Sequence, residues 1–178
     1  FILALIKNKI KMNFASGVLI HGGGWKKLID QGVSNAKLKE VAEIVFPNIV
    51  CKNYYGMIEQ TGSIYFECDL GYLHSNDYAS VIARNNNLEE LPFGVEGIIQ
   101  SISTLPKSYP GHSLLTEDIG IVHGFDDCKC GKKGVYFNVP IYGNLINYTW
   151  RPLTKDPGAK LNRRHTLHGL LVKLKPIN

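Results

Sequence analysis

The chain of 178 residues is long enough for one substantial core or two small subdomains, and with 44% hydrophobic and 20% charged residues it has the composition of a folded protein. No apolar run reaches the roughly 18 residues that a membrane-spanning helix needs. The apolar start, residues 1–6, has neither the preceding basic residues nor the following cleavage site of a signal peptide. We therefore expect a cytoplasmic protein in which residues 1–10 form a core strand.

The net charge of +5 is unevenly distributed along the chain. Residues 129–178 contain ten Lys or Arg and a single acid, Asp156, whereas residues 1–128 contain ten basic and 14 acidic residues. A basic segment of this kind is compatible with nucleic acid or an acidic surface as a partner. Because the segment has no recognisable nucleic-acid motif, we interpret it as a solvated tail and do not expect nucleic acid as a partner.

A strand, a helix and a second strand are predicted near the start of the chain. Residues 16–20 have the apolar character of a buried strand, and residues 49–53 that of another. Between them, apolar residues at helical spacing predict a helix over residues 36–46, with Asn35 as its N-cap. This order favours a parallel α/β unit.

The pattern changes to short alternating segments after residue 62. Turn residues separate the strands that we expect, which are residues 63–68, 78–83, 96–105, 113–116 and 119–122. Such a series is typical of an antiparallel sheet or a small distorted barrel. From Pro140 onward the periodicity weakens, and we assign no structure there.

Four short motifs contain the residues best suited to chemistry. In chain order they are His21-Gly22-Gly23-Gly24-Trp25-Lys26, Tyr55-Gly56-Met57-Ile58-Glu59, Leu115-Thr116-Glu117-Asp118-Ile119-Gly120 and Asp127-Cys128-Lys129-Cys130-Gly131. Alone, the second motif is also what an ordinary strand running into a turn looks like. Together they resemble the glycine-rich strand-end loop, the Tyr-Gly-x-Thr-Glu motif and the Thr-Gly-Asp motif of adenylate-forming enzymes. The last motif resembles the Cys-x-Cys-Gly turn of the branch that contains phenylacetate-CoA ligases and acyl-protein synthetases.

The resemblance, which covers about residues 15–139, implies a ligase that uses ATP and Mg²⁺ to convert a fatty or related carboxylic acid into an acyl-adenylate. The acyl acceptor would be the thiol of CoA or of a protein. By resemblance Glu59 is the catalytic carboxylate that holds Mg²⁺, and Asp118 accepts hydrogen bonds from the ribose hydroxyls. Further contacts to the adenine or the acyl group are implied for His21, Gly22, Gly23, Gly24, Tyr55 and Gly56. For His21, a hydrogen-bonded histidine at a strand end is nearly as good an interpretation.

Some positions depart from the pattern of the family. Ile58 replaces the usual Thr, and Glu117 replaces the usual Gly. No phosphate loop precedes Ser16, the hinge Gly-Arg has no counterpart near Gly143-Asn144, and no cysteine follows Cys130. We therefore expect part of an adenylating domain, with activity incomplete in this chain.

The resemblance also divides the chain into three parts. Residues 1–62 would be the C-terminal part of an α/β subdomain that binds the nucleotide and the acyl group. Residues 63–139 would be a β-rich subdomain with a zinc knuckle, and residues 140–178 a basic tail of unassigned structure.

Cysteine and histidine spacing raises a separate possibility of metal binding. Cys68, His74, Cys128 and Cys130 form a Cys3His set, which is a common composition for a closed structural zinc site. The alternative is two unrelated pairs, one buried in a strand and one in a reduced surface turn. Cys51 lies in an apolar strand, and we expect it in the core. An alternative to the ligase follows, namely a catalytically inactive, zinc-stabilised module that binds a nucleotide or a protein.

Overall fold

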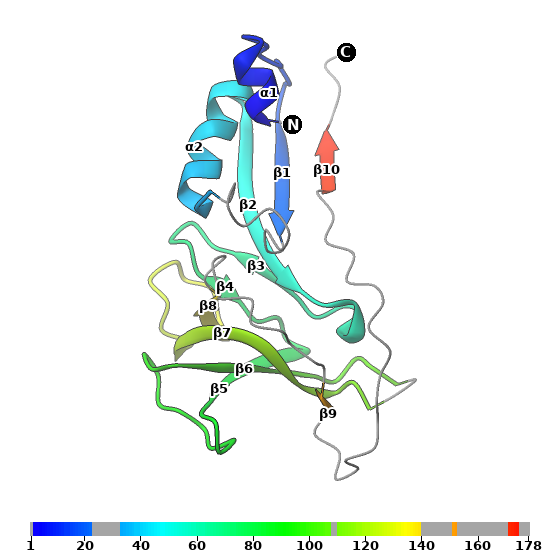
Figure 1. The fold of residues 1–178 in the computed structure, drawn as a ribbon, viewed down its shortest axis with the longest axis vertical. Coiled ribbons are helices and arrows are strands. Elements are labelled where there is room, and N and C mark those ends of the chain that lie inside the picture. Colours follow the sequence, from blue (N-terminus) through cyan, green and yellow to red (C-terminus); the bar gives the residue numbers. More distant parts are fainter. Residues whose placement is uncertain (1, 23–32, 108–109, 140–150, 153–170, 175–178) are drawn as a thin grey trace. The chain divides into compact units, whose positions relative to one another are not determined.

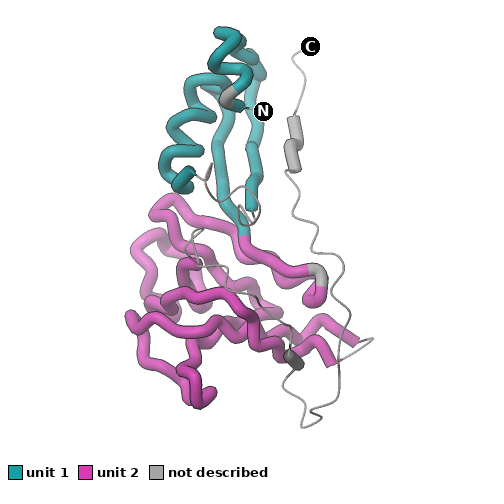
Figure 2. Tube along the Cα trace, viewed as in Figure 1, with its two compact units in different colours: residues 1–54, 168–178 teal, residues 55–167 magenta. Residues whose placement is uncertain are grey.

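The computed structural model describes residues 2–22, 33–107, 110–139, 151–152 and 171–174, and it confirms a mixed α/β fold (Figure 1). The chain divides into two compact units (Figure 2). The first comprises residues 1–54 and 168–178, and the second comprises residues 55–167. Most of the predicted basic tail, and with it Gly23 and Gly24, lies outside the described residues. Within the described residues, no helix combines the length and the apolarity needed to cross a bilayer.

The first unit contains the predicted parallel strand pair. Strands β1 (Gly17–Gly22) and β2 (Ile49–Gly56) run parallel in a register that sets Gly17 opposite Ile49 and Gly22 opposite Tyr54. Helix α2 (Asn35–Val45) connects them, so the predicted parallel unit is confirmed. Strand β10 (Leu171–Leu174) pairs antiparallel with β1.

Helix α2 packs against one face of the strand pair β1 and β2 (Figure 1). The core of the unit consists of Leu19, Ala42, Val45, Phe46, Ile49 and Cys51. Cys51 is thus a core residue, as its apolar context predicts. The prediction of a core strand over residues 1–10 is wrong, because Ile2–Lys7 form helix α1. Ile2, Leu5 and Ile6 recur at helical spacing and pack against this core, which accounts for the helix.

The start of α2 also differs from the prediction by one residue. Ser34, not Asn35, is the N-cap, since its backbone is extended and its Oγ accepts a hydrogen bond from the Lys37 N–H at 3.1 Å. Asn35 is already the first residue of the helix. Serine and asparagine are both favoured as N-caps, so residue propensity alone does not decide between Ser34 and Asn35.

The second unit is an antiparallel sheet, as predicted. Its strands are β3 (Ile64–Glu67), β4 (Leu73–His74), β5 (Ala79–Arg84), β6 (Glu96–Ser103), β7 (Ser113–Phe125) and β8 (Val135–Asn138). They lie in the order β3-β4-β8-β7-β6-β5, and β9 (Arg151–Pro152) pairs with β7. The core cluster consists of Tyr65, Leu73, Val81, Ala83, Ile99, Val122, Val135 and Phe137.

Strand β7 replaces the two short strands expected at residues 113–116 and 119–122. Its pairing with β6 joins Leu115 to Gln100 and Ile119 to Ile98, so three residues of β7 lie opposite Ile99. The break between two strands in the sequence pattern is therefore a β-bulge inside one long strand, at residues 116–118.

Candidate active site and metal-ligand cluster

A hydrogen bond joins two of the motifs that the sequence separates by 63 residues. The Tyr55 hydroxyl donates to Asp118 Oδ2 at 2.8 Å. Tyr55 lies near the end of β2, and its ring packs against Tyr65 and Phe137 in the core of the second unit. Asp118 is exposed, so its carboxylate is accessible to a ligand while Tyr55 fixes one oxygen. The structure thus brings together two predicted site residues.

The bulge in β7 determines how Asp118 is presented. Thr116 Oγ1 donates to the Ile99 carbonyl at 2.6 Å and accepts from the Asp118 N–H at 3.2 Å. The threonine side chain therefore satisfies backbone groups that the interrupted ladder leaves over. Bulges are frequent beside functional sites because they redirect a side chain. Asp118 lies inside the long strand β7, between the two short strands that the sequence pattern predicts.

Tyr55 is held in its protonated form. Burial raises the pKa of its hydroxyl well above the usual value, and the negative charge and hydrogen bond of Asp118 raise it further. A hydrogen bond with Thr116 opposes this shift. The phenol therefore remains a hydrogen-bond donor to Asp118 throughout the neutral pH range.

Glu59 lies on a single 3₁₀ turn, Ile58–Gln60, immediately after β2. Its neighbour Gln60 is fully buried. Gln60 Nε2 donates to the carbonyls of Ser101 and Gly111 at 3.0 and 2.8 Å, and the Ser101 hydroxyl donates to Gln60 Oε1 at 2.5 Å. The turn that carries Glu59 is thereby anchored to β6 and to the segment before β7.

Sequence reasoning missed Gln60. In the sequence, Gln60 is simply a polar residue that directly follows the Glu59 motif, and polar residues are common in turns. Its burial depends on Ser101 and Gly111, which lie 41 and 51 residues away. No local sequence pattern predicts hydrogen bonds between residues so far apart in the chain.

One glycine from each of the first two motifs, Gly22 and Gly56, lies close to neighbouring groups. A Cβ at Gly22 would lie 2.7 Å from both the carbonyl oxygen and a ring carbon of Tyr54, so only glycine fits beside that residue. A Cβ at Gly56 would lie 3.3 Å from the Ser63 carbonyl oxygen. His21 is buried near the end of β1, in the register position opposite Asn53 of β2. The roles of these residues toward adenine or an acyl group stay predictions.

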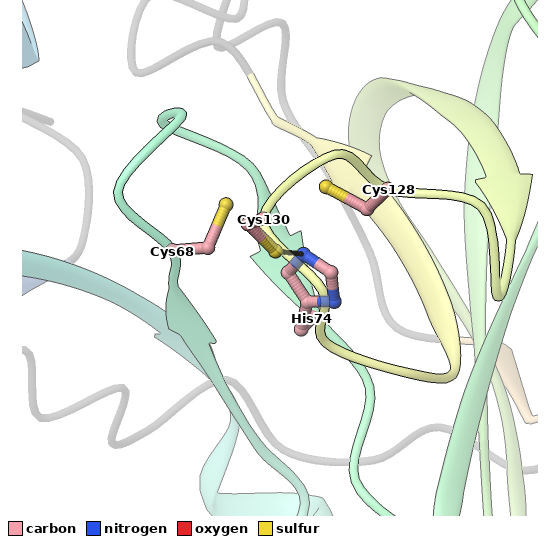
Figure 3. A group of neighbouring side chains, drawn as sticks. All are labelled: Cys68, His74, Cys128 and Cys130. Atoms are coloured by element: carbon pink, nitrogen blue, oxygen red, sulfur yellow. Dashed lines mark hydrogen bonds between the residues drawn. The ribbon is translucent and has the colours of Figure 1, made fainter.

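The four predicted metal ligands converge in the second unit (Figure 3). Their ligand atoms all lie within 4.8 Å of one another, and Cys130 Sγ lies 3.4 Å from His74 Nε2. Cys68, His74 and Cys128 are buried. None of the three cysteines of the cluster, Cys68, Cys128 and Cys130, forms a disulfide. The ligands come from the end of β3, from β4 and from the turn between β7 and β8.

Protonation states in this cluster are shifted in different directions. Burial lowers the pKa of His74; a backbone hydrogen bond to Lys133 opposes this, and the charge of Lys132 lowers the pKa further. The neutral imidazole that a metal requires is therefore favoured. Burial raises the pKa of Cys128. Burial also acts to raise the pKa of Cys130, but hydrogen bonds from the Lys132 N–H and the neighbouring thiols outweigh it, so this pKa lies below its usual value.

Comparison with known proteins places these features in context. Residues 5–144 match the family described as acyl-protein synthetase, LuxE. Among solved structures, the chain is similar to the amide bond synthetase McbA from Marinactinospora thermotolerans, with 12% sequence identity and a TM-score of 0.39. That match covers 79% of this chain and 33% of the other, so the chain spans about a third of the synthetase's length. A search of curated proteins found no match. The family match includes all four motifs.

Proposed function

This chain belongs to the acyl-protein synthetase (LuxE) family, and we propose that it is part of an ATP-dependent ligase that forms an acyl-adenylate from a fatty or related carboxylic acid. The supporting observation is the hydrogen bond from Tyr55 to Asp118. It unites two motifs to which the resemblance gives neighbouring roles at one nucleotide. A chance likeness of two short motifs would not require their side chains to meet.

The proposed reaction makes a clear demand on the chain's residues. A substrate carboxylate oxygen attacks the α-phosphorus of ATP, a new P–O bond forms, and the bond to the bridging oxygen breaks. Pyrophosphate leaves with the electron pair of that bond. Negative charge builds up on the phosphate oxygens, and a bound Mg²⁺ ion would neutralise part of it. The carboxylate of Glu59 is a hard oxygen ligand of the type that Mg²⁺ prefers.

Asp118 fits the task of binding the ribose. Its carboxylate is exposed, and a carboxylate offers about four acceptor positions, of which Tyr55 occupies one. Two ribose hydroxyls can therefore donate to the remaining positions. Tyr55, as a protonated donor, keeps the carboxylate in one orientation for them. The activated acyl group would then pass to a thiol of CoA or of a protein.

Carboxylate-dependent exchange between ATP and pyrophosphate tests this proposal in the full-length protein. We expect Glu59→Gln to lower kcat by about 10²–10³-fold, because a charge that acts in the transition state is removed. Asp118→Asn should chiefly raise the KM for ATP, by about tenfold, because the ribose is bound equally in ground and transition states.

Two exposed carboxylates provide matched controls. Glu43→Gln on α2 and Asp77→Asn before β5 make the same chemical changes at positions without a proposed role. Both should retain normal exchange. Near-normal turnover of Glu59→Gln at saturating Mg²⁺ would contradict the role of Glu59. Nucleotide binding without exchange, for any carboxylic acid, would favour the inactive binding module instead.

A further inference from the structure

We propose that Cys68, His74, Cys128 and Cys130 bind one zinc ion in a closed structural site. Four side chains, from the turn after β3, from β4 and from the turn between β7 and β8, point toward one another (Figure 3), and their ligand atoms lie within 4.8 Å of one another. Three thiols and one imidazole form one of the donor sets that tetrahedral structural zinc takes. This inference is independent of the roles of Glu59 and Asp118.

The geometry of the cluster approaches a zinc tetrahedron. Ligand distances of about 2.3 Å for sulfur and about 2.05 Å for nitrogen place a tetrahedral sulfur–nitrogen pair about 3.6 Å apart, and a sulfur–sulfur pair about 3.8 Å apart. Cys130 Sγ and His74 Nε2 are separated by 3.4 Å, close to the first value. Since no pair exceeds 4.8 Å, side-chain shifts of about 1 Å complete the tetrahedron.

Two turns of the same design face each other across the cluster. In Cys68-Asp69-Leu70-Gly71, the Gly71 N–H donates to the Cys68 carbonyl at 3.0 Å. In Cys128-Lys129-Cys130-Gly131, the Gly131 N–H donates to the Cys128 carbonyl at the same distance. Both glycines have positive φ, 85° and 83°, which side-chain-bearing residues rarely adopt. Each Cys-x-x-Gly turn thus holds its cysteine in a fixed direction, and this direction is set by backbone rather than by sulfur contacts.

One backbone contact favours the charged, metal-binding form of a thiol in the cluster. The Lys132 N–H donates to Cys130 Sγ at 3.4 Å, a contact that stabilises a thiolate. Three thiolates and one Zn²⁺ leave a net charge of −1. Lys129, Lys132 and Lys133 lie in the same turn and supply positive charge, and Lys133 Nζ is held in place by the Asp126 carbonyl at 3.1 Å.

The four protein ligands leave no open position, so the site is structural rather than catalytic. The metal joins the turn after β3 to the turn between β7 and β8. Strands β4 and β8 pair between these turns, with His74 opposite Tyr136. Such a short strand as β4, two residues long, adds little ladder energy of its own, and the metal would fix its position.

Metal content of the full chain, purified without chelator or added metal, is the first test. We expect about one equivalent of zinc per chain. After removal of zinc, Co²⁺ should restore one equivalent and give the visible absorption of a tetrahedral site together with sulfur-to-cobalt charge transfer. This spectrum reports the ligand set directly and needs no enzyme activity.

Cys128→Ser and Cys51→Ser form the matched pair of variants. Cys128→Ser should hold less than about a tenth of an equivalent of zinc and lose the charge-transfer band. Cys51, buried in the core of the first unit, should be replaceable without any change in metal content. If Cys128→Ser does not fold, His74→Cys keeps a four-thiol set and should retain zinc with an altered cobalt spectrum.

Three results would overturn the proposal. The first is wild-type protein with less than about a tenth of an equivalent of any metal and a melting temperature that chelator does not change. The second is a disulfide between two of the three thiols in freshly isolated protein. The third is iron with acid-labile sulfide in place of zinc.

Discussion

At the scale of single residues, Tyr55 has two functions that a substitution can separate. Its ring fills space between Tyr65 and Phe137, and its hydroxyl donates to Asp118. Tyr55→Phe keeps the ring and removes only the hydrogen bond. Because Asp118 is exposed, water can replace the lost donor, so the free energy of unfolding should fall by only about 0.5–1.5 kcal/mol.

The same variant should change the dependence of stability on alkaline pH. The pKa of Tyr55 is raised on folding by burial and by Asp118, so the folded state favours the neutral phenol. The resulting stability is fully present below the usual tyrosine pKa of about 10 and is lost as pH rises above it. Denaturant unfolding between pH 8 and pH 11 should therefore show a steeper alkaline loss in the wild type than in Tyr55→Phe.

A control and a contrary result define this test. Tyr78→Phe, at an exposed position, should leave the pH profile unchanged. Equal alkaline slopes in wild type and Tyr55→Phe would show that the hydroxyl is not buried against Asp118. Tyr65, whose pKa is also raised by burial, remains in both proteins and so cancels from the comparison.

At the scale of elements, local patterns predicted what local physics determines. The helix α2 and the strands β1 and β2 agree with their predictions within a few residues, because apolar periodicity is a local property of the sequence. The failures involve partners far along the chain. Residues 2–7 are helical because one face meets the α2 core. Strand β7 continues through residues 116–118 because Thr116 replaces ladder hydrogen bonds there.

The candidate site divides in the same way. The motifs predicted Tyr55, Glu59 and Asp118 as site residues by resemblance, and cysteine and histidine spacing predicted the four metal ligands whose side chains the structure brings together. Gln60 could not be predicted. Its burial follows from hydrogen bonds to Ser101 and Gly111, which only the tertiary fold supplies.

Replacement of Gln60 tests whether this anchor positions Glu59. Gln60→Leu removes the hydrogen bonds to the carbonyls of Ser101 and Gly111 and to the Ser101 hydroxyl, which keeps its bond with Tyr65, so the protein should lose about 1–3 kcal/mol of stability. If the turn also orients Glu59, the Mg²⁺ concentration for half-maximal exchange should rise in the full-length protein. The KM for the carboxylic acid should change less than kcat.

Gln100→Leu is the matched control. Gln100 is also a buried glutamine, and it accepts from Arg84 Nε at 2.7 Å and donates to Ser113 Oγ at 2.8 Å. Its loss should destabilise the protein by a similar amount without changing the Mg²⁺ dependence. If both variants changed the Mg²⁺ dependence equally, Gln60 would stabilise the fold without positioning Glu59.

At the scale of the whole molecule, two hydrophobic cores divide the stability of the chain. One consists of residues of β1, α2 and β2, and the other of residues of the antiparallel sheet. The proposed metal ligands all belong to the second unit. A metal that constrains only one unit should stabilise that unit alone, since stability varies between cooperative units of one structure.

Hydrogen exchange on the metal-loaded full chain, before and after chelation, tests this division. Loss of metal should speed amide exchange by about tenfold or more in residues 68–74 and 128–138, where the ligands and their paired strands lie. The amides of α2 should exchange at an unchanged rate, because that helix packs on the separate core around Val45 and Phe46. Val45→Ala should produce the reverse pattern, with faster exchange in α2 and normal protection around Cys128. Faster exchange in both units after chelation would mean that the two cores open as one cooperative body, through the continuous strand β2 that passes from the first unit into the second.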